Sequence, residues 1–153
     1  NSIIIGAALI AIFFNDLLYK EIPDIFSLPA VMIALENGIL FFPSMIPEIL
    51  IGALAGGLFF QLQIMISKGK WVGSGDVRLG ILMGVVLGWK LLIIALFGAY
   101  VAGASMALYL LIKKKVSLQT AIPFGPYLVL GTFLAFFAGE FILNWYLDAL
   151  III

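Results

Sequence analysis

The sequence contains no cysteine and no histidine, and only 10% of its 153 residues are charged. Without cysteine and histidine there are no disulfides, no Cys/His metal site and no Ser-His triad. The low charge contrasts with ordinary soluble domains, in which about a quarter of the residues are charged. Carboxylates, hydroxyls and lysines are the side chains left for hydrolytic chemistry, and we expect neither a metal nor another cofactor.

Apolar residues make up 65% of the sequence. A run of about 20 apolar residues spans a bilayer, so six spans would use about 120 residues and leave short loops. The sequence therefore predicts an all-α integral membrane protein with about six transmembrane helices and no nucleic-acid partner. The predicted helices lie near residues 2–18, 25–42, 49–66, 76–87, 91–112 and 127–146. We expect a single transmembrane domain over residues 1–153, and we find no internal repeat.

Proline and glycine mark the predicted helix boundaries. Pro23 disfavours helix in the residue before it, so we expect the first helix to end there and Asp24 to cap the second. A turn at residues 88–90 separates the fourth helix from the fifth. In the third helix, Gly52-x-x-x-Gly56 would let another helix approach closely.

The basic residues are distributed unevenly between the two predicted sides of the membrane. The loops after the first, third and fifth helices contain most of them: Lys20, Lys68, Lys70, Arg78, Lys113, Lys114 and Lys115. The other side contains only Lys90. Because cytoplasmic loops are rich in Lys and Arg, the first set is predicted to face the cytoplasm, with the amino terminus outside the cell membrane. Asp16, Asp76 and residues 123–127 would then meet at the cytoplasmic side.

Two aspartates, Asp16 and Asp76, lie at the ends of apolar runs. A carboxylate at bilayer depth is costly unless it is paired, hydrated or neutralised, so both are candidates for function. Two carboxylates held together share a proton, and one can then activate water while the other polarises a peptide carbonyl. Gly73 and Gly75, beside Asp76, would let a backbone and a substrate approach closely.

Structural roles would also account for each acidic residue taken alone. Asp16 could pair with Lys20, one helical turn later. Asp76 could cap the fourth helix, with Arg78 as its ion-pair partner. Glu140, inside the last predicted helix, could make an interhelical contact or take part in function.

Three segments together resemble the type IV prepilin peptidases and their archaeal preflagellin-peptidase relatives. Residues 16–24 resemble the family's Asp followed by a polar turn and Ile/Leu-Pro-Asp/Asn. Residues 73–79 resemble its Gly-x-Gly-Asp followed by a hydrophobic residue, a base and Leu. Residues 122–128 are close to the Pro-Phe-Gly-Pro stretch of the bacterial members. The order and spacing of the three segments also fit the family.

The resemblance implies a six-span membrane aspartyl endopeptidase of the Gly-x-Gly-Asp type, with Asp16 and Asp76 as its catalytic residues. Its substrates would be precursors of type IV pilins, pseudopilins or archaellins, cut at the cytoplasmic face after a Gly that ends a short basic leader. The residues that would shape the site are Gly73, Gly75, Pro23, Asp24, Pro123, Gly125 and Pro126. Many bacterial members also have an amino-terminal region with a Cys tetrad and methylate the new amino terminus. This sequence has no Cys, so we do not expect methylation from it.

Two other classes of membrane protein share parts of this pattern. Proteases of the presenilin type also use Gly-x-Gly-Asp, but a Pro-Ala-Leu motif follows there, whereas this sequence has Pro-Phe-Gly-Pro. A small transporter could use Asp16 and Asp76 as ion or proton ligands. Transporter halves are expected to show repeat symmetry, and we find none in this sequence.

Overall fold

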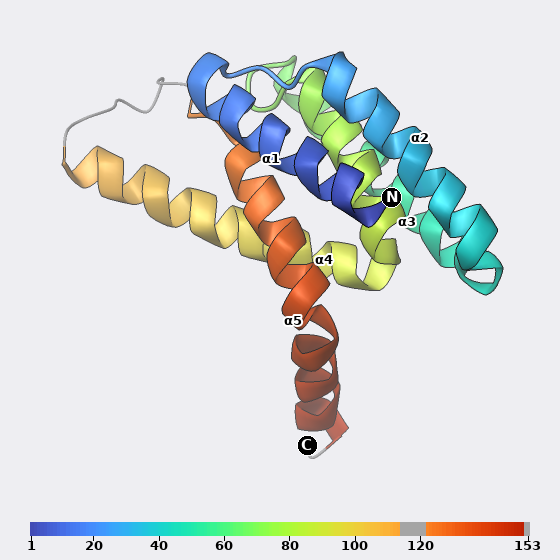
Figure 1. The fold of residues 1–153 in the computed structure, drawn as a ribbon. Helices are drawn as coiled ribbons and strands as arrows, with labels where there is room; N and C mark the ends of the chain where they lie inside the picture. The colour runs from blue at the N-terminus through green and yellow to red at the C-terminus, as the bar shows by residue number, and fades with distance from the viewer. Residues whose placement is uncertain (114–121, 152–153) are drawn as a thin grey trace.

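The structure, a computed structural model, describes residues 1–113 and 122–151 and is built from helices (Figure 1). The elements are α1 (Ser2–Tyr19), α2 (Asp24–Phe41), the short 3-10 helix η1 (Pro43–Met45), α3 (Ile46–Ser67), α4 (Ser74–Ile112) and α5 (Gly125–Ile151). The five α-helices are long and apolar enough to cross a membrane. The predicted all-α class is confirmed. Lys114, Lys115 and the connection expected at residues 116–121 lie outside the described residues.

Helix α4 contains both the fourth and the fifth predicted helix. Gly88 interrupts it with a φ of 69° and a ψ of 172°, so α4 consists of two helical segments, 74–87 and 89–112. This positive φ suits glycine, which has no Cβ to clash with the backbone. Figure 1 shows the chain turning sharply between the segments. The predicted three-residue turn is thus reduced to one residue, because a single glycine in this conformation redirects the chain.

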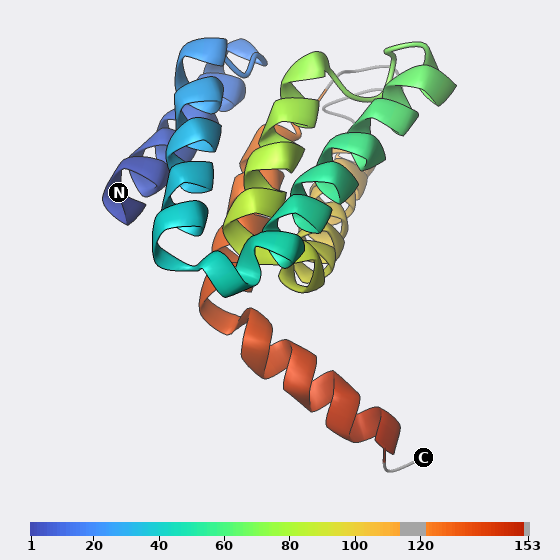
Figure 2. The ribbon, with the colours of Figure 1, turned by 90° about the vertical axis from the view of Figure 1, so that its right-hand side faces the viewer.

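The first segment of α4 lies at the centre of the bundle. Its Leu79, Leu82 and Met83 are completely buried. Helix α3 makes the most extensive contact with α4, followed by α5 and α2, while α1 contacts α2 and α5. The C-terminal part of α5 projects away from the other helices (Figure 2). The start of α4, where Asp76 lies, is therefore held by packing on several sides.

Helices α3 and α4 approach each other through glycines. Gly52 and Gly56 of α3 face Gly84 and Gly80 of α4, and a Cβ added to any of the four would crowd the carbonyl oxygen of its partner. The predicted close approach at Gly52-x-x-x-Gly56 is confirmed. Such packing matters in a membrane, because lipid tails are as apolar as the side chains and give helices little hydrophobic reason to associate.

We expect Gly84→Ala to destabilise the protein by about 1–3 kcal/mol, the usual cost of overpacking. The new methyl group would overlap the backbone of Gly52, which cannot rotate away as a side chain can. Gly6→Ala is the matched control, because a Cβ there has nothing within 4 Å. Titration with a denaturing detergent measures both stabilities. Equal values for the two variants would contradict the close helix contact.

The connection between α1 and α2 corrects one prediction. Helix α1 ends at Tyr19, near the predicted boundary, but Asp24 does not cap α2. Pro23 is the N-cap residue, and its carbonyl accepts the N–H of Ser27 at 3.2 Å. Asp24 is the first helical residue, and its carboxylate forms an ion pair with Arg78 of α4. A carboxylate in the first turn still suits the helix dipole, so the side chain is free to link α2 to α4.

Candidate active site

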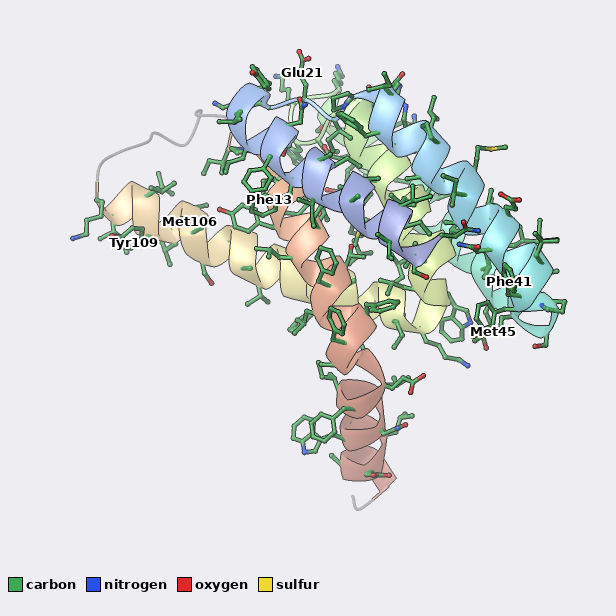
Figure 3. All side chains as sticks on the ribbon, viewed as in Figure 1. Phe13, Glu21, Phe41, Met45, Met106 and Tyr109 are labelled. Atoms are coloured by element: carbon green, nitrogen blue, oxygen red, sulfur yellow. The ribbon has the colours of Figure 1, made fainter. Side chains whose placement is uncertain are left out.

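A cavity of about 470 Å³ lies where α1 ends and α4 begins. Asp16 of α1 and Asp76 of α4 both line it, as do parts of the connections before α2 and before α4 and residues 122–124. Glu21, another lining residue, marks this end of the bundle in Figure 3, opposite the end marked by Phe41. Segments far apart in the sequence therefore meet around two carboxylates.

Asp16 lies in the last turn of α1 and is only 6% exposed. Its Oδ2 accepts a 2.8 Å hydrogen bond from the backbone N–H of Gly125, which is 109 residues away in the sequence. Gly125 is the first residue of α5. N–H groups at the start of a helix have no intrahelical partner, and the helix dipole there favours negative charge. The start of α5 therefore fixes one oxygen of Asp16.

Asp76 is the third residue of α4 and is 8% exposed. Its Oδ2 accepts a 2.8 Å hydrogen bond from the N–H of Gly73, the N-cap residue. Its own N–H donates to the carbonyl of Gly73 at 3.1 Å. Asp76 thus closes the start of α4 and lines the cavity at the same time. The ion-pair partner considered for it, Arg78, binds Asp24 instead.

The two glycines beside Asp76 differ in how closely they are packed. A Cβ on Gly75 would lie 2.7 Å from the Cβ of Ile22, which also lines the cavity. A Cβ on Gly73 would meet only the Oδ2 of Asp76 at 3.8 Å and the Gly75 nitrogen at 4.0 Å, both ordinary contacts. The φ of Gly73 is −95°, which any residue can adopt. Packing therefore requires glycine at position 75 and tolerates alanine at position 73.

The other predicted site residues surround the cavity in different ways. Pro123 lines it. Pro23 and Asp24 do not line it. Pro23 is the N-cap of α2 and Asp24 is its first residue. The ion pair between Asp24 and Arg78 links α2 to α4 at a position two residues after Asp76. Gly125 and Pro126 are buried at the start of α5.

Several lining residues lie outside the predicted site, and Ile22 and Phe124 are two of them. Each lies inside a segment that carries the family resemblance, directly before Pro23 and Gly125 respectively, and this position was the available signal. Glu140 is exposed and does not line the cavity.

Basic side chains gather at the same end of the bundle. Lys20, Lys70 and Arg78 line the cavity. Lys90, predicted to lie on the other side of the membrane, forms a 2.9 Å ion pair with Glu48, near the start of α3.

Within residues 1–113 and 122–151 there is no group of three or more carboxylates that could hold a metal ion. Asp16 and Asp76 bring two carboxyl groups to the cavity.

Apolar helices joined by short connections, with two buried aspartates at one end, define a multi-pass membrane protein with a carboxylate site. The model of the type IV leader peptidase family matches residues 3–108. The chain belongs to this family, which favours the prepilin-peptidase resemblance over the presenilin type. No solved structure is a significant match.

Curated relatives similar to this chain carry the name prepilin leader peptidase/N-methyltransferase. That of Legionella pneumophila is 38% identical over 144 residues, covering 91% of this chain and 50% of the relative. That of Aeromonas hydrophila is 34% identical over 149 residues, covering 91% of this chain and 49% of the relative. That of Bacillus subtilis (strain 168) is 34% identical over 98 residues, covering 64% and 39%. The chain therefore spans about half the length of the first two relatives.

The contrast between Gly75 and Gly73 gives a prediction for the site. We expect Gly75→Ala to lower the rate of peptide cleavage roughly tenfold to a hundredfold, because the new methyl group would push Ile22 and the connection before α2 away from Asp76. We expect Gly73→Ala to keep most of the activity. Peptide cleavage by detergent-solubilised variants, compared at equal amounts of folded protein, measures both. An equal loss in the two variants would show that a bound peptide, and not Ile22, sets the requirement for glycine.

Proposed function

We propose that this chain is a membrane aspartyl endopeptidase domain that removes the short leader of prepilin-like precursors. The observation that carries the proposal is the pair of nearly buried aspartates, Asp16 and Asp76, which line one cavity and are each held by a backbone N–H at 2.8 Å. The names of the relatives support it, since they include prepilin leader peptidase. Those names also include N-methyltransferase, and we assign only the peptidase reaction to residues 1–153.

In the proposed reaction one aspartate is ionised and the other is protonated. The ionised carboxylate takes a proton from water, whose oxygen attacks the carbonyl carbon of the peptide bond, while the protonated carboxyl donates its proton to the carbonyl oxygen. The tetrahedral intermediate then collapses and the C–N bond breaks. The carboxyl that took the proton from water gives it to the leaving nitrogen, and the other carboxylate takes a proton back from a hydroxyl of the intermediate. The two carboxyl groups act as a unit, because neighbouring carboxylates do not both ionise at low cost.

The backbone donors prepare the pair for this reaction. The N–H groups of Gly125 and Gly73 fix one oxygen on each aspartate, so neither carboxyl has to reorient as charge moves between them. We assign the remaining predicted residues to shaping the site. These residues are Gly75, Pro23, Asp24, Pro123 and Pro126.

The proposal includes an orientation in the cell membrane. Lys20, Lys70 and Arg78 line the cavity, and positively charged loops favour the cytoplasmic side. The cavity would then face the cytoplasm, with the amino terminus on the opposite side. A precursor anchored in the same bilayer by its hydrophobic helix would present its leader to the cavity and be cut after the leader's last Gly.

Co-expression with a tagged prepilin-like precursor tests the proposal. We expect the precursor to lose its leader, and mass spectrometry to find the new amino terminus directly after the Gly. A chain carrying both Asp16→Asn and Asp76→Asn is the blank. An uncut precursor, with the parent chain present in the membrane at the level of the blank, would overturn the proposal, as would equal cleavage by the blank.

A further inference from the structure

An exposed tryptophan, Trp71, lies at the candidate active site. It belongs to the connection between α3 and α4, residues 68–73, and it lines the same cavity as Asp16 and Asp76. Trp71 is 68% exposed, although an indole is among the largest apolar groups that a protein can bury. The proposed reaction between the two aspartates and water gives this side chain no role.

The backbone on both sides of Trp71 is held in place. The N–H of Trp71 donates a 3.3 Å hydrogen bond to the hydroxyl oxygen of Ser67, a buried residue that ends α3. The next residue, Val72, is buried, and Gly73 after it donates its N–H to Asp76. The indole is therefore exposed although its backbone is fixed relative to Asp76.

The other two tryptophans have different surroundings. Trp89 follows the turn at Gly88, and its ring lies 5.7 Å from the Nζ of Lys90. Trp145 lies in the C-terminal part of α5. Neither of them lines the cavity that holds the aspartates. Tryptophan is common where a membrane meets water, which suits exposed positions of this kind. Trp71 differs because a molecule that enters the cavity would contact its ring.

We propose that Trp71 is a substrate-binding residue whose indole covers the peptide that occupies the cavity. The inference rests on the proposed peptidase function and adds a residue that holds the substrate. An indole offers an apolar ring and one N–H donor, which suit a peptide chain with its apolar groups and carbonyl oxygens. The contact is the same before and during the reaction, so it strengthens substrate binding without speeding the chemical step.

Kinetics with purified protein in detergent micelles test the proposal. We expect Trp71→Ala to raise the KM for a precursor peptide about tenfold, while kcat stays within about twofold of the parent value. Trp71→Phe keeps an aromatic ring and is expected to recover most of the binding. Trp145→Ala is the matched control, because Trp145 is 65% exposed and does not line the cavity. Its KM should equal that of the parent.

Fluorescence provides a second readout that needs no change at position 71. The sequence has three tryptophans, so Trp89→Phe and Trp145→Phe together leave Trp71 alone, and Asp76→Asn is added to prevent cleavage. A precursor peptide without tryptophan, labelled with a dye, is then titrated in. Anisotropy of the dye reports binding. We expect the emission of Trp71 to shift to shorter wavelength with the same midpoint, because the bound peptide excludes water from the ring.

The outcomes separate this inference from the peptidase proposal. Cleavage by Trp71→Ala with the parent's KM would overturn the inference and leave the peptidase function standing, as expected if the indole contacts lipid headgroups. A lower kcat at an unchanged KM would also overturn it. So would peptide binding with no change in Trp71 emission, and this result decides alone if Trp71→Ala does not fold. If the parent cuts no precursor and the peptide does not bind, both proposals fail.

Discussion

Asp16→Asn and Asp76→Asn are each expected to lower leader cleavage by about 10³-fold or more. Proton transfer by a positioned side chain contributes about 10²-fold to 10⁴-fold to catalysis. Asparagine can neither take a proton from water nor give one to a carbonyl. We also expect the double variant to be about as inactive as either single variant, because residues that act as a unit have strongly non-additive effects. Initial rates on a tagged precursor, with enough enzyme to detect residual cutting, measure all three.

These variants are expected to fold, because the amide oxygen of asparagine can still accept the N–H of Gly125 or Gly73. Glu140→Gln is the control, since it makes the same kind of change in α5 at an exposed residue outside the cavity. It should cut at the parent rate. Substantial cleavage by either single aspartate variant would assign that aspartate a structural role and contradict the paired mechanism.

Gly125→Ala is expected to lower cleavage about a hundredfold, the cost of displacing a catalytic group by about 1 Å. A Cβ on Gly125 would lie 2.7 Å from Oδ2 and 3.0 Å from Cγ of Asp16. The carboxylate would have to move, and its hydrogen bond to the Gly125 N–H would be lost or lengthened. Cleavage rates, together with stability in a detergent titration, separate lost activity from lost folding.

Gly73→Ala is the matched comparison for Gly125→Ala. Both glycines donate an N–H to an aspartate of the pair, but a Cβ on Gly73 would be 3.8 Å from Oδ2 of Asp76. The same methyl group is therefore tolerated beside one carboxylate and excluded beside the other. Parent-like cleavage by Gly125→Ala would mean that Asp16 has room to shift without loss of function, and the geometric argument would fail.

Much of the fold follows from local sequence patterns. Long apolar runs predict helices, and Pro23 and Gly88 mark two of their boundaries. The lysines and Arg78 predict that one end of the bundle differs from the other, and Lys20, Lys70 and Arg78 indeed line the cavity at that end. These predictions succeed because each depends on a few neighbouring residues.

The errors and omissions concern partners distant in the sequence. Arg78 lies two residues from Asp76, yet it pairs with Asp24, because the start of α2 packs against the start of α4. The contact of Ile22 with Gly75 is not predictable from either segment alone, because it exists only once these segments meet. A side chain has several partners within reach in the sequence, and packing selects one of them.

The sequence by itself determined that this chain is a bundle of membrane-sized helices with two aspartates at the same end. Hydropathy and the Gly and Pro positions are properties of the chain before it folds, and the bilayer turns them directly into helices. Only the tertiary structure decided which backbone groups hold the aspartates, that Gly52 and Gly56 meet Gly84 and Gly80, and that Trp71 lines the same cavity as the aspartates. Those contacts depend on the angles and depths at which helices pack, and these are set by the fit of surfaces that no single segment contains.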